Sequence, residues 1–177
     1  MAKTRKLTIR DIVYIGMLAA FCTISTTIKI PYGNGAMVHL GTAALYTIAL
    51  IFGGTYAGMS GAIGTAFFDL MMGFSPYTLW SFFIKGIAGF IVGTVAYGGG
   101  AGGEKWGRNL IACILGAVWT LLGYLVAWTV VIGNLPAAMT NIPSSLVTSG
   151  VGMLVAIPLS ATLRFSLGKA GLLKQQI

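Results

Sequence analysis

Apolar stretches occupy almost the whole of this sequence and determine the class of fold that it can adopt. A helix needs about 20 apolar residues to cross the hydrocarbon core of a bilayer. Only 8% of the residues are charged, against about 25% in an average soluble domain, so the chain cannot cover a water-facing surface of its own size. We therefore predict an all-α, polytopic membrane protein, a single domain of residues 1–177 built as a bundle of six transmembrane helices. The six predicted helices are residues 12–28, 40–52, 55–72, 77–97, 110–132 and 144–167.

Basic residues are distributed unevenly over the two sides of this bundle. With six spans, the two termini, the turn at 53–54 and the loop after residue 97 share one side, and Lys29 is the only basic residue near the other surface. Segments rich in lysine and arginine stay in the cytoplasm, so we expect cytoplasmic termini in a bacterial cell membrane. The net charge of +8 then reports topology and not binding to nucleic acid. The basic side holds Lys3, Arg5, Lys6, Arg10, Lys105, Arg108, Arg164, Lys169 and Lys174.

Two ionisable residues lie inside the predicted spans, where a charge is costly and therefore marks a functional position. Asp69 is about one turn from the outer end of the third stretch, and Lys85 is about two turns from the outer end of the fourth. The short segment between these stretches makes their helices neighbours. Two interpretations stay open: a buried ion pair that holds the helices together, or contact of both residues with a polar ligand. Removal of either residue is damaging in both cases.

Aromatic and polar residues gather in the same outer half of the bundle. Taken singly, an aromatic residue at this depth is typical of a membrane anchor, and a lone histidine in an outer segment is typical of a solvated loop. Their convergence from several helices instead favours a pocket for a flat heteroaromatic molecule, which needs aromatic faces and a few hydrogen-bonding groups. The residues concerned are Tyr77, Trp80, Tyr124, Trp128, Asn134, Asn141 and His39.

Small residues line one face of three predicted helices. One interpretation is close packing between helices of this chain. The other is that part of this surface contacts a second membrane subunit, and the residues alone do not separate the two. The small residues are Gly16, Ala20 and Thr23 on the first helix, Gly54, Gly58, Gly61 and Gly64 on the third, and Gly86, Gly89 and Gly93 on the fourth.

Several classes of function lack the residues that they require. The sequence has no Walker A, G-x-S-x-G or H-E-x-x-H motif. Its single histidine and its two separated cysteines, Cys22 and Cys113, form no metal-binding pattern. No series of acidic residues crosses the predicted bilayer, as a proton-driven pump usually needs. We therefore expect neither an enzyme nor a resident cofactor or metal ion, and any transport must draw its energy from another protein.

Several short segments of the sequence together form a pattern that is shared with a known family. They are K-L-T-I-R-D-I-V before the first helix, Gly16-Met-Leu-Ala-Ala20 within it, V-H-L-G at 38–41, F-G-G-T-Y-A-G-M-S-G-A-I-G at 52–64, D-L-M-M-G-F at 69–74 and I-K-G-I-A-G at 84–89. This pattern resembles the S component, the substrate-binding subunit, of energy-coupling factor (ECF) vitamin transporters. It is most similar to the riboflavin-transporter-like group, which includes S components assigned to hydroxymethylpyrimidine or pyridoxine.

The resemblance implies a six-helix subunit that binds a vitamin or precursor near the outer face, under a lid formed by the first outer loop. It implies three partners: a transmembrane T subunit and two cytoplasmic ATPases that supply the energy. The small-residue motif that contacts the T subunit in this family is matched by Gly16 and Ala20. One departure is Thr42, which stands after His39-Leu-Gly where an acidic residue is expected, and it leaves the identity of the vitamin open.

We therefore expect high-affinity binding of a small vitamin or precursor, with a vitamin B6 or hydroxymethylpyrimidine compound favoured. In this hypothesis Lys85 and Asp69 contact polar or ring-nitrogen groups of the ligand, the aromatic residues stack on its ring, and Asn134 and Asn141 close hydrogen bonds from above. Three alternatives remain: another vitamin such as riboflavin, a structural membrane subunit without a ligand, and a facilitator that works alone.

Overall fold

The computed structural model describes residues 7–32 and 36–169 and contains six long helices in the predicted order. They are α1 (Ile9–Thr27), α2 (Gly41–Phe52), α3 (Gly54–Met71), α4 (Thr78–Tyr97), α5 (Trp106–Ile132) and α7 (Ile142–Lys169). The all-α prediction is confirmed, and most helix ends differ by a few residues from the predicted ones. The predicted topological residues Lys3, Arg5, Lys6 and Lys174 lie outside the described residues.

Five smaller elements of the described residues were not predicted. A two-stranded antiparallel hairpin, β1 (Lys29–Tyr32) and β2 (Ala36–His39), follows α1 with Lys29 opposite His39. The short helix α6 (Leu135–Met139) lies between α5 and α7. Single 3-10 turns, Ser75–Tyr77 and Gly98–Gly100, flank α4. Nearly all of their residues lie between the predicted helices, where no regular structure was expected.

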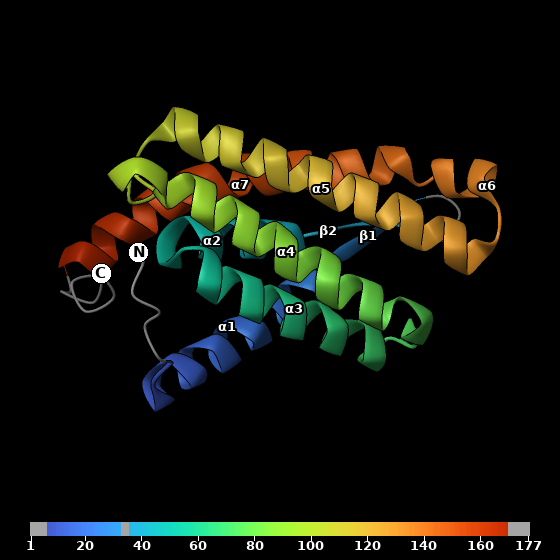
Figure 1. The fold of residues 1–177 in the computed structure, drawn as a ribbon, viewed down its shortest axis with the longest axis horizontal. Coiled ribbons are helices and arrows are strands. Elements are labelled where there is room, and N and C mark those ends of the chain that lie inside the picture. The colour runs from blue at the N-terminus through green and yellow to red at the C-terminus, as the bar shows by residue number, and fades with distance from the viewer. Residues whose placement is uncertain (1–6, 33–35, 170–177) are drawn as a thin grey trace.

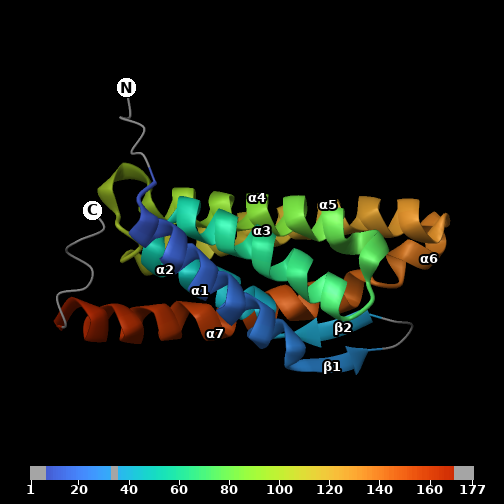
Figure 2. The ribbon, with the colours of Figure 1, turned by 90° about the horizontal axis from the view of Figure 1, so that it is seen from below.

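The long helices run lengthwise through the molecule and divide it into two ends (Figure 1). The start of α1, the end of α7 and the α4–α5 connection lie at one end, which we call the terminal end. The β-hairpin, the α3–α4 turn and α6 lie towards the other, which we call the hairpin end. Figure 2 shows α3, α4 and α5 on one side of the molecule and α7 with the hairpin on the other.

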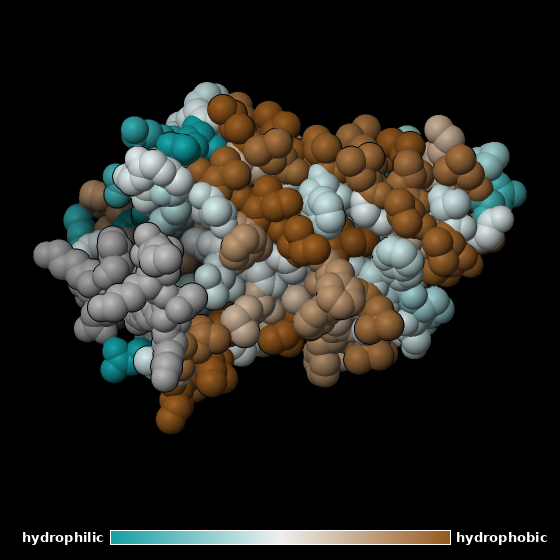
Figure 3. Space-filling model, viewed as in Figure 1, coloured by the Kyte–Doolittle hydropathy of each residue, from teal (hydrophilic) through white to brown (hydrophobic). Residues whose placement is uncertain are grey.

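Apolar side chains cover the middle of the bundle surface. Figure 3 shows hydrophobic residues across the centre of one face and hydrophilic residues gathered at its two ends. Leu79, Val130 and Leu154 are between 62% and 78% exposed, which is costly in water and favourable in lipid. In the described residues, four helical segments are long and apolar enough to cross a membrane: Ile9–Thr27, Ser75–Gly100, Trp106–Ile132 and Leu135–Lys169. The protein is therefore a multi-pass membrane protein.

Helix α2 forms the centre of the bundle. Every residue from Gly41 to Ile51 is buried, and α2 packs against α1, α3, α4 and α7. A helix that is hydrophobic on all sides is expected in such a position. Its 12 residues span only about 18 Å, well short of the roughly 30 Å hydrocarbon core. The central helix therefore fills the terminal half of the bundle and stops before the hairpin end.

Close glycine packing joins α3 to α4 and α1 to α3. A Cβ atom at Gly93 would lie 2.2 Å from the backbone nitrogen of Gly54, and one at Gly64 would lie 2.5 Å from the carbonyl oxygen of Ala19. These distances leave no room for a side chain, so the small residues of α3 and α4 serve packing within this chain, the first of the two interpretations above. Gly16 differs, because a Cβ there would have no neighbour within 4 Å.

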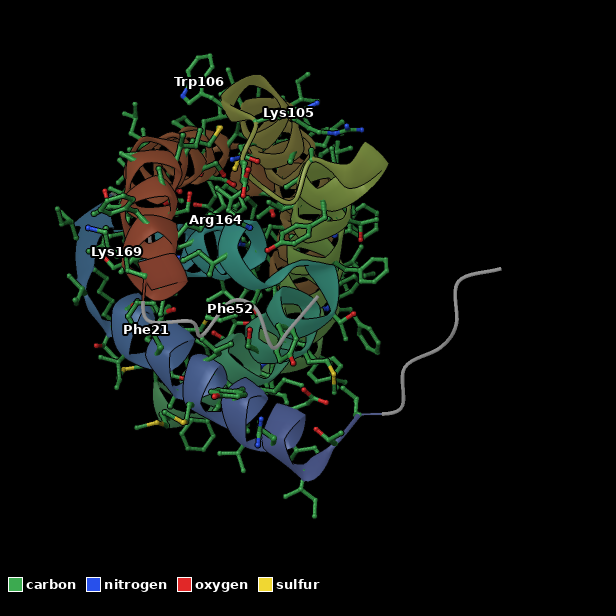
Figure 4. The ribbon with its side chains drawn as sticks, turned by 90° about the vertical axis from the view of Figure 1, so that its left-hand side faces the viewer. Phe21, Phe52, Lys105, Trp106, Arg164 and Lys169 are labelled. Atoms are coloured by element: carbon green, nitrogen blue, oxygen red, sulfur yellow. The ribbon has the colours of Figure 1, made fainter. Side chains whose placement is uncertain are left out.

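One arginine side chain joins three helices at the terminal end. Arg164 of α7 donates from Nη2 to the carbonyl oxygen of Leu50 at 2.6 Å and to the hydroxyl of Tyr97 at 2.5 Å. Leu50 belongs to the last turn of α2, where unpaired carbonyl groups attract a cation. Figure 4 looks onto this end, with Arg164 inside the ring of helices and Lys105, Trp106 and Lys169 around it. The terminal end thus joins α2, α4 and α7 and carries most of the described basic residues.

Candidate ligand-binding site

A cavity of about 380 Å³ lies towards the hairpin end, beside the start of α2. Its volume is within the usual range of small-molecule sites, about 300–1,000 Å³. Its walls come from α1, β2, α3, α4 and α5, together with the segments before α4 and α7. The lining residues are Thr26, Met37, His39, Thr65, Phe68, Asp69, Phe74, Tyr77, Ser81, Lys85, Tyr124, Trp128, Ile132 and Asn141.

Lys85 is the cation of this cavity. Its side chain is only 3% exposed, and its ammonium group donates to the hydroxyl oxygen of Thr42 at 3.0 Å. The ammonium also lies 5.6 Å from the ring centroid of Tyr124, within the range of a cation–π contact. Its hydrogen-bond partner is therefore neutral, and two of its three donor positions have no partner among the described side chains.

Asp69 is the anion of the cavity. The residue is 8% exposed, and its Oδ2 atom is buried without a hydrogen-bond partner in the described part of the chain. Asp69 and Lys85 are close enough for electrostatic attraction, but they form no ion pair within 4.0 Å. The structure therefore does not support the interpretation of a contact ion pair, and it leaves an acceptor and a donor facing one cavity.

Two aromatic pairs form parts of the wall. Phe68 and Phe74 stack with centroids 6.5 Å apart and ring planes 26° apart. Tyr124 and Trp128, one turn apart on α5, stack at 5.6 Å and 28°. The Tyr124 hydroxyl is 2.9 Å from the hydroxyl of Ser81 on α4, which fixes the ring in place. Such walls suit a flat ring, because offset stacking is favourable for aromatic groups.

His39 contributes a directed hydrogen-bond donor. Its Nδ1 atom accepts the backbone N–H of Gly41 at 3.2 Å, so a neutral ring carries its proton on Nε2. Burial, and then the positive charges of Lys85 and Lys29, lower the pKa of His39 from 6.5 to about 3. The ring is therefore neutral at physiological pH and offers its Nε2–H to the cavity.

The β-hairpin covers the cavity on one side. Met37 and His39 of β2 line it, and the hydroxyl of Thr148 on α7 donates to the carbonyl oxygen of Met37 at 3.3 Å. On the other strand, the ammonium of Lys29 lies 5.5 Å from the ring centroid of Phe68 and 5.7 Å from that of Phe74. The hairpin is therefore attached to both α7 and the end of α3.

The structure brings together most of the side chains that were predicted from the sequence to bind a ligand. Two of them do not line the cavity. The side-chain oxygen of Asn134 instead accepts the backbone N–H of Ala137 at 3.2 Å and caps α6, and Trp80 is partly exposed on α4. Those that line the cavity are Lys85, Asp69, Tyr77, Tyr124, Trp128, Asn141 and His39.

Several lining residues were missed by the sequence analysis. Thr65 and Ser81 each lie one helical turn before a predicted residue, Asp69 and Lys85 respectively, so the i, i+4 rule could have found them. Phe68 carries no such signal, because a phenylalanine in a membrane helix faces lipid as readily as a cavity. The full set of missed residues is Thr26, Met37, Thr65, Phe68, Phe74, Ser81 and Ile132.

The residues predicted to contact a partner subunit line a groove between α1 and α3. Gly16 and Ala20 are exposed in this groove. Thr23 is only 7% exposed and donates its hydroxyl to the carbonyl oxygen of Gly64 at 2.9 Å. Thr23 therefore helps to hold α1 against α3, and the accessible part of the groove is formed by the other two residues.

Comparison with known proteins gave one family and two relatives. The family described as ECF-type riboflavin transporter, S component, matches residues 6–164. The chain is 31% identical over 103 residues to an "uncharacterized protein in gap 3'region" of Pyrococcus woesei, covering 58% of this chain and 66% of that protein. It is 28% identical over 111 residues to the thiamine precursor transporter HmpT of Lactococcus lactis subsp. cremoris (strain MG1363), covering 62% and 63%. Each match spans slightly less than two thirds of the relative.

Proposed function

The chain belongs to the family of ECF-type riboflavin transporter S components, and on this premise we propose that it binds a small vitamin or vitamin precursor with high affinity for ATP-driven uptake. The family consists of transporter subunits and not of enzymes. In this proposal the chain supplies the binding site, and a transmembrane T subunit with two cytoplasmic ATPases supplies the energy.

The observation that carries this proposal is a cavity whose wall holds two separated charges, Asp69 and Lys85. Asp69 has an unpaired carboxylate oxygen, and Lys85 has unused donors, inside a wall that is otherwise largely aromatic. A buried charge is costly, and a bound molecule with polar groups on a flat ring offers partners to both the carboxylate and the ammonium group. A subunit with a purely structural role has no need of such a site.

The favoured ligands are a vitamin B6 compound or hydroxymethylpyrimidine. Both are single flat rings with short polar substituents. A ring of this kind suits a cavity of about 380 Å³ whose wall contains two stacked aromatic pairs. The name of HmpT, a thiamine precursor transporter, supports a precursor of this kind. Riboflavin is the second candidate, and the description of the family favours it.

The proposed orientation places the hairpin end at the outer face and the terminal end in the cytoplasm. The described basic residues support it, because Arg10, Lys105, Arg108, Arg164 and Lys169 lie in segments at the terminal end and only Lys29 lies in the hairpin. The cavity then opens towards the side from which a nutrient arrives. Protease or cysteine-labelling assays on intact cells test this orientation, and a labelled residue 105 in unbroken cells contradicts it.

A binding panel tests the proposed function. Thermal unfolding of the purified chain in detergent is measured with pyridoxine, 4-amino-5-hydroxymethyl-2-methylpyrimidine, thiamine and riboflavin. A ligand at 100 times its Kd stabilises the protein by about 2.7 kcal/mol, which raises the midpoint by several degrees. The absence of any shift, confirmed by calorimetry, would sink the proposal. Vitamin flux into liposomes from this chain alone would instead favour the independent facilitator.

The partner contact is tested separately from ligand binding. Gly16 is replaced by leucine in the α1–α3 groove, and Gly150 of α7 is replaced by leucine as the matched control, since neither position has an atom within 4 Å of an added Cβ. Gly16→Leu should abolish co-purification with the T subunit and keep ligand binding, whereas Gly150→Leu should keep both. Equal co-purification of the two variants contradicts the assignment of Gly16, Ala20 and Thr23 to this contact.

A further inference from the structure

We propose that the cavity admits the unphosphorylated form of its ring ligand and rejects the phosphate ester, with Asp69 as the residue that makes this distinction. The inference rests on the proposed function, because it presupposes a heteroaromatic ligand in this cavity. It adds a chemical requirement: the ligand offers an N–H or amino donor to Asp69 and a neutral oxygen or ring nitrogen to Lys85.

The charged side chains that line the cavity have a net charge of zero. Among the residues that line it, Lys85 is the one cationic side chain, Asp69 is the one anionic side chain, and no arginine is present. His39 is neutral there, because its pKa is lowered to about 3 by burial and by the two lysines. Lys29 is outside the lining, with its ammonium against the rings of Phe68 and Phe74. A phosphate monoester carries about −1.5 to −2 charges at pH 7, and one lysine beside a carboxylate does not neutralise it.

Asp69 has the wrong hydrogen-bonding character for a phosphate. A carboxylate only accepts hydrogen bonds, and Oδ2 of Asp69 is buried without a donor in the described residues. A ring N–H or an exocyclic amino group of a ligand is a suitable donor to the carboxylate of Asp69. Phosphate oxygens are themselves acceptors, so they cannot donate to this carboxylate, and their negative charge adds repulsion in a site of low dielectric constant. Asp69 therefore favours one ligand form and opposes the other.

The first N–H group of α2 is not available to offset this repulsion. Free backbone N–H groups at a helix start commonly bind phosphate, and α2 begins beside the cavity. Here the N–H of Gly41 is already donated to Nδ1 of His39 at 3.2 Å. One donor of Lys85 is likewise taken by Thr42, at 3.0 Å. The N–H of Gly41 and this one donor of Lys85 are therefore not available to a phosphate group.

Matched pairs of alcohol and phosphate ester test the inference by calorimetry on the full chain in detergent. The pairs are pyridoxine and pyridoxine 5′-phosphate, 4-amino-5-hydroxymethyl-2-methylpyrimidine and its monophosphate, and riboflavin and riboflavin 5′-phosphate. For the pair whose alcohol binds, the ester should bind at least about tenfold more weakly, since like charges in an interface are strongly unfavourable. An ester within threefold of its alcohol overturns the inference and leaves the proposed function intact.

Asp69→Asn tests the residue itself, and Glu104→Gln, the same carboxylate-to-amide exchange in an exposed side chain at the terminal end, is its control. Asp69→Asn should weaken binding of the alcohol and reduce the ratio of ester to alcohol Kd by about tenfold or more, whereas Glu104→Gln should leave both Kd values as in the parent. An unchanged ratio in Asp69→Asn overturns the role of Asp69. If that variant does not fold, the comparison in the parent protein still decides the selectivity. If none of the compounds binds, the proposed function fails and this inference fails with it.

Discussion

Replacing Lys85 by methionine separates two roles that a buried lysine can have, support of the fold and recognition of a ligand. Methionine keeps the length of the side chain and its apolar stem and removes the charge. Lys85 has one hydrogen bond, to Thr42 at 3.0 Å, and a ring contact with Tyr124 at 5.6 Å. No ion pair within 4.0 Å depends on it, so the exchange leaves no carboxylate that has lost a contacting cation.

The two effects on stability oppose each other. A hydrogen bond from a charged group contributes about 1.5–3 kcal/mol and a desolvated cation–π contact about 1–2 kcal/mol. Burial of the ammonium group costs several kcal/mol, and the side chain is only 3% exposed. We therefore expect the free energy of unfolding of the ligand-free protein to change by less than about 2 kcal/mol, and the thermal midpoint to shift by less than about 8 °C.

The effect of this substitution on ligand affinity has no opposing term. Loss of one charge-assisted hydrogen bond to the ligand costs about 1.5–3 kcal/mol, which raises Kd about 10- to 150-fold. Calorimetry with the tightest-binding compound of the panel measures Kd, and thermal unfolding without ligand measures stability. Lys105→Met, the same exchange at an exposed position of the terminal end, should change neither. A Kd within threefold of the parent in Lys85→Met, or a midpoint lowered by far more than the expected limit, would refute this reasoning.

Exchanging Gly93 for alanine should lower the thermal midpoint by several degrees, because the new Cβ would lie 2.2 Å from backbone of α3 and overpacking costs about 1–3 kcal/mol; Gly16→Ala, in open space, is the control, and an equal loss in both would count against the packing argument. His39 binds a proton with a pKa of about 3 in the fold and 6.5 in its ordinary state, so the unfolded chain binds more protons between these values. The free energy of unfolding therefore falls as the pH drops below about 6.5, by at most about 1.4 kcal/mol per pH unit. The midpoint of the parent should fall more between pH 7.5 and 5.5 than that of His39→Gln, and parallel falls would contradict this. Trp128→Ala should raise the Kd of the ligand about tenfold through lost stacking, whereas Trp80→Ala, outside the cavity, should leave it unchanged; calorimetry showing the reverse order would place the site elsewhere.

The helices were predictable because lipid imposes a length on apolar stretches. The smaller elements were harder to predict from the sequence. The strands of the hairpin have four residues each, too few for a period of two to stand out. For α6 a signal was present and was not used: Asn134 is followed within two residues by a proline, the combination that commonly opens a helix.

The candidate site was predictable at the positions where the residue type is rare in membrane helices. Asp69 and Lys85 stand out because charges inside membrane helices are unusual, and the short α3–α4 turn places them together. Trp80 was assigned to the site and Ser81 was not, although the structure has the opposite arrangement. Neighbouring positions on a helix differ by about 100° in direction, and no feature of the sequence gives the rotation of α4 about its own axis.

The role of Thr42 was visible in the sequence only as a departure from the expected family pattern. The structure places its hydroxyl on the ammonium of Lys85, where an acidic residue would have neutralised the charge. That neutral partner leaves the positive charge of Lys85 without a contacting anion, as the proposed ligand contact requires. A difference at one position of α2 thus changes the chemistry of a residue on α4, a relation that spacing along the chain does not reveal.

The shortness of α2 suggests how a bundle of this kind can change its cargo during evolution. The cavity occupies the space along the bundle axis that α2 leaves by beginning at Gly41. An insertion that added one turn at this start would extend the helix by about 5.4 Å into that space, and a deletion would enlarge it. Neither change touches the glycine packing of α3 on α4 or the arginine contacts at the other end. Cavity size could therefore be altered by moving one helix start, independently of these packing contacts.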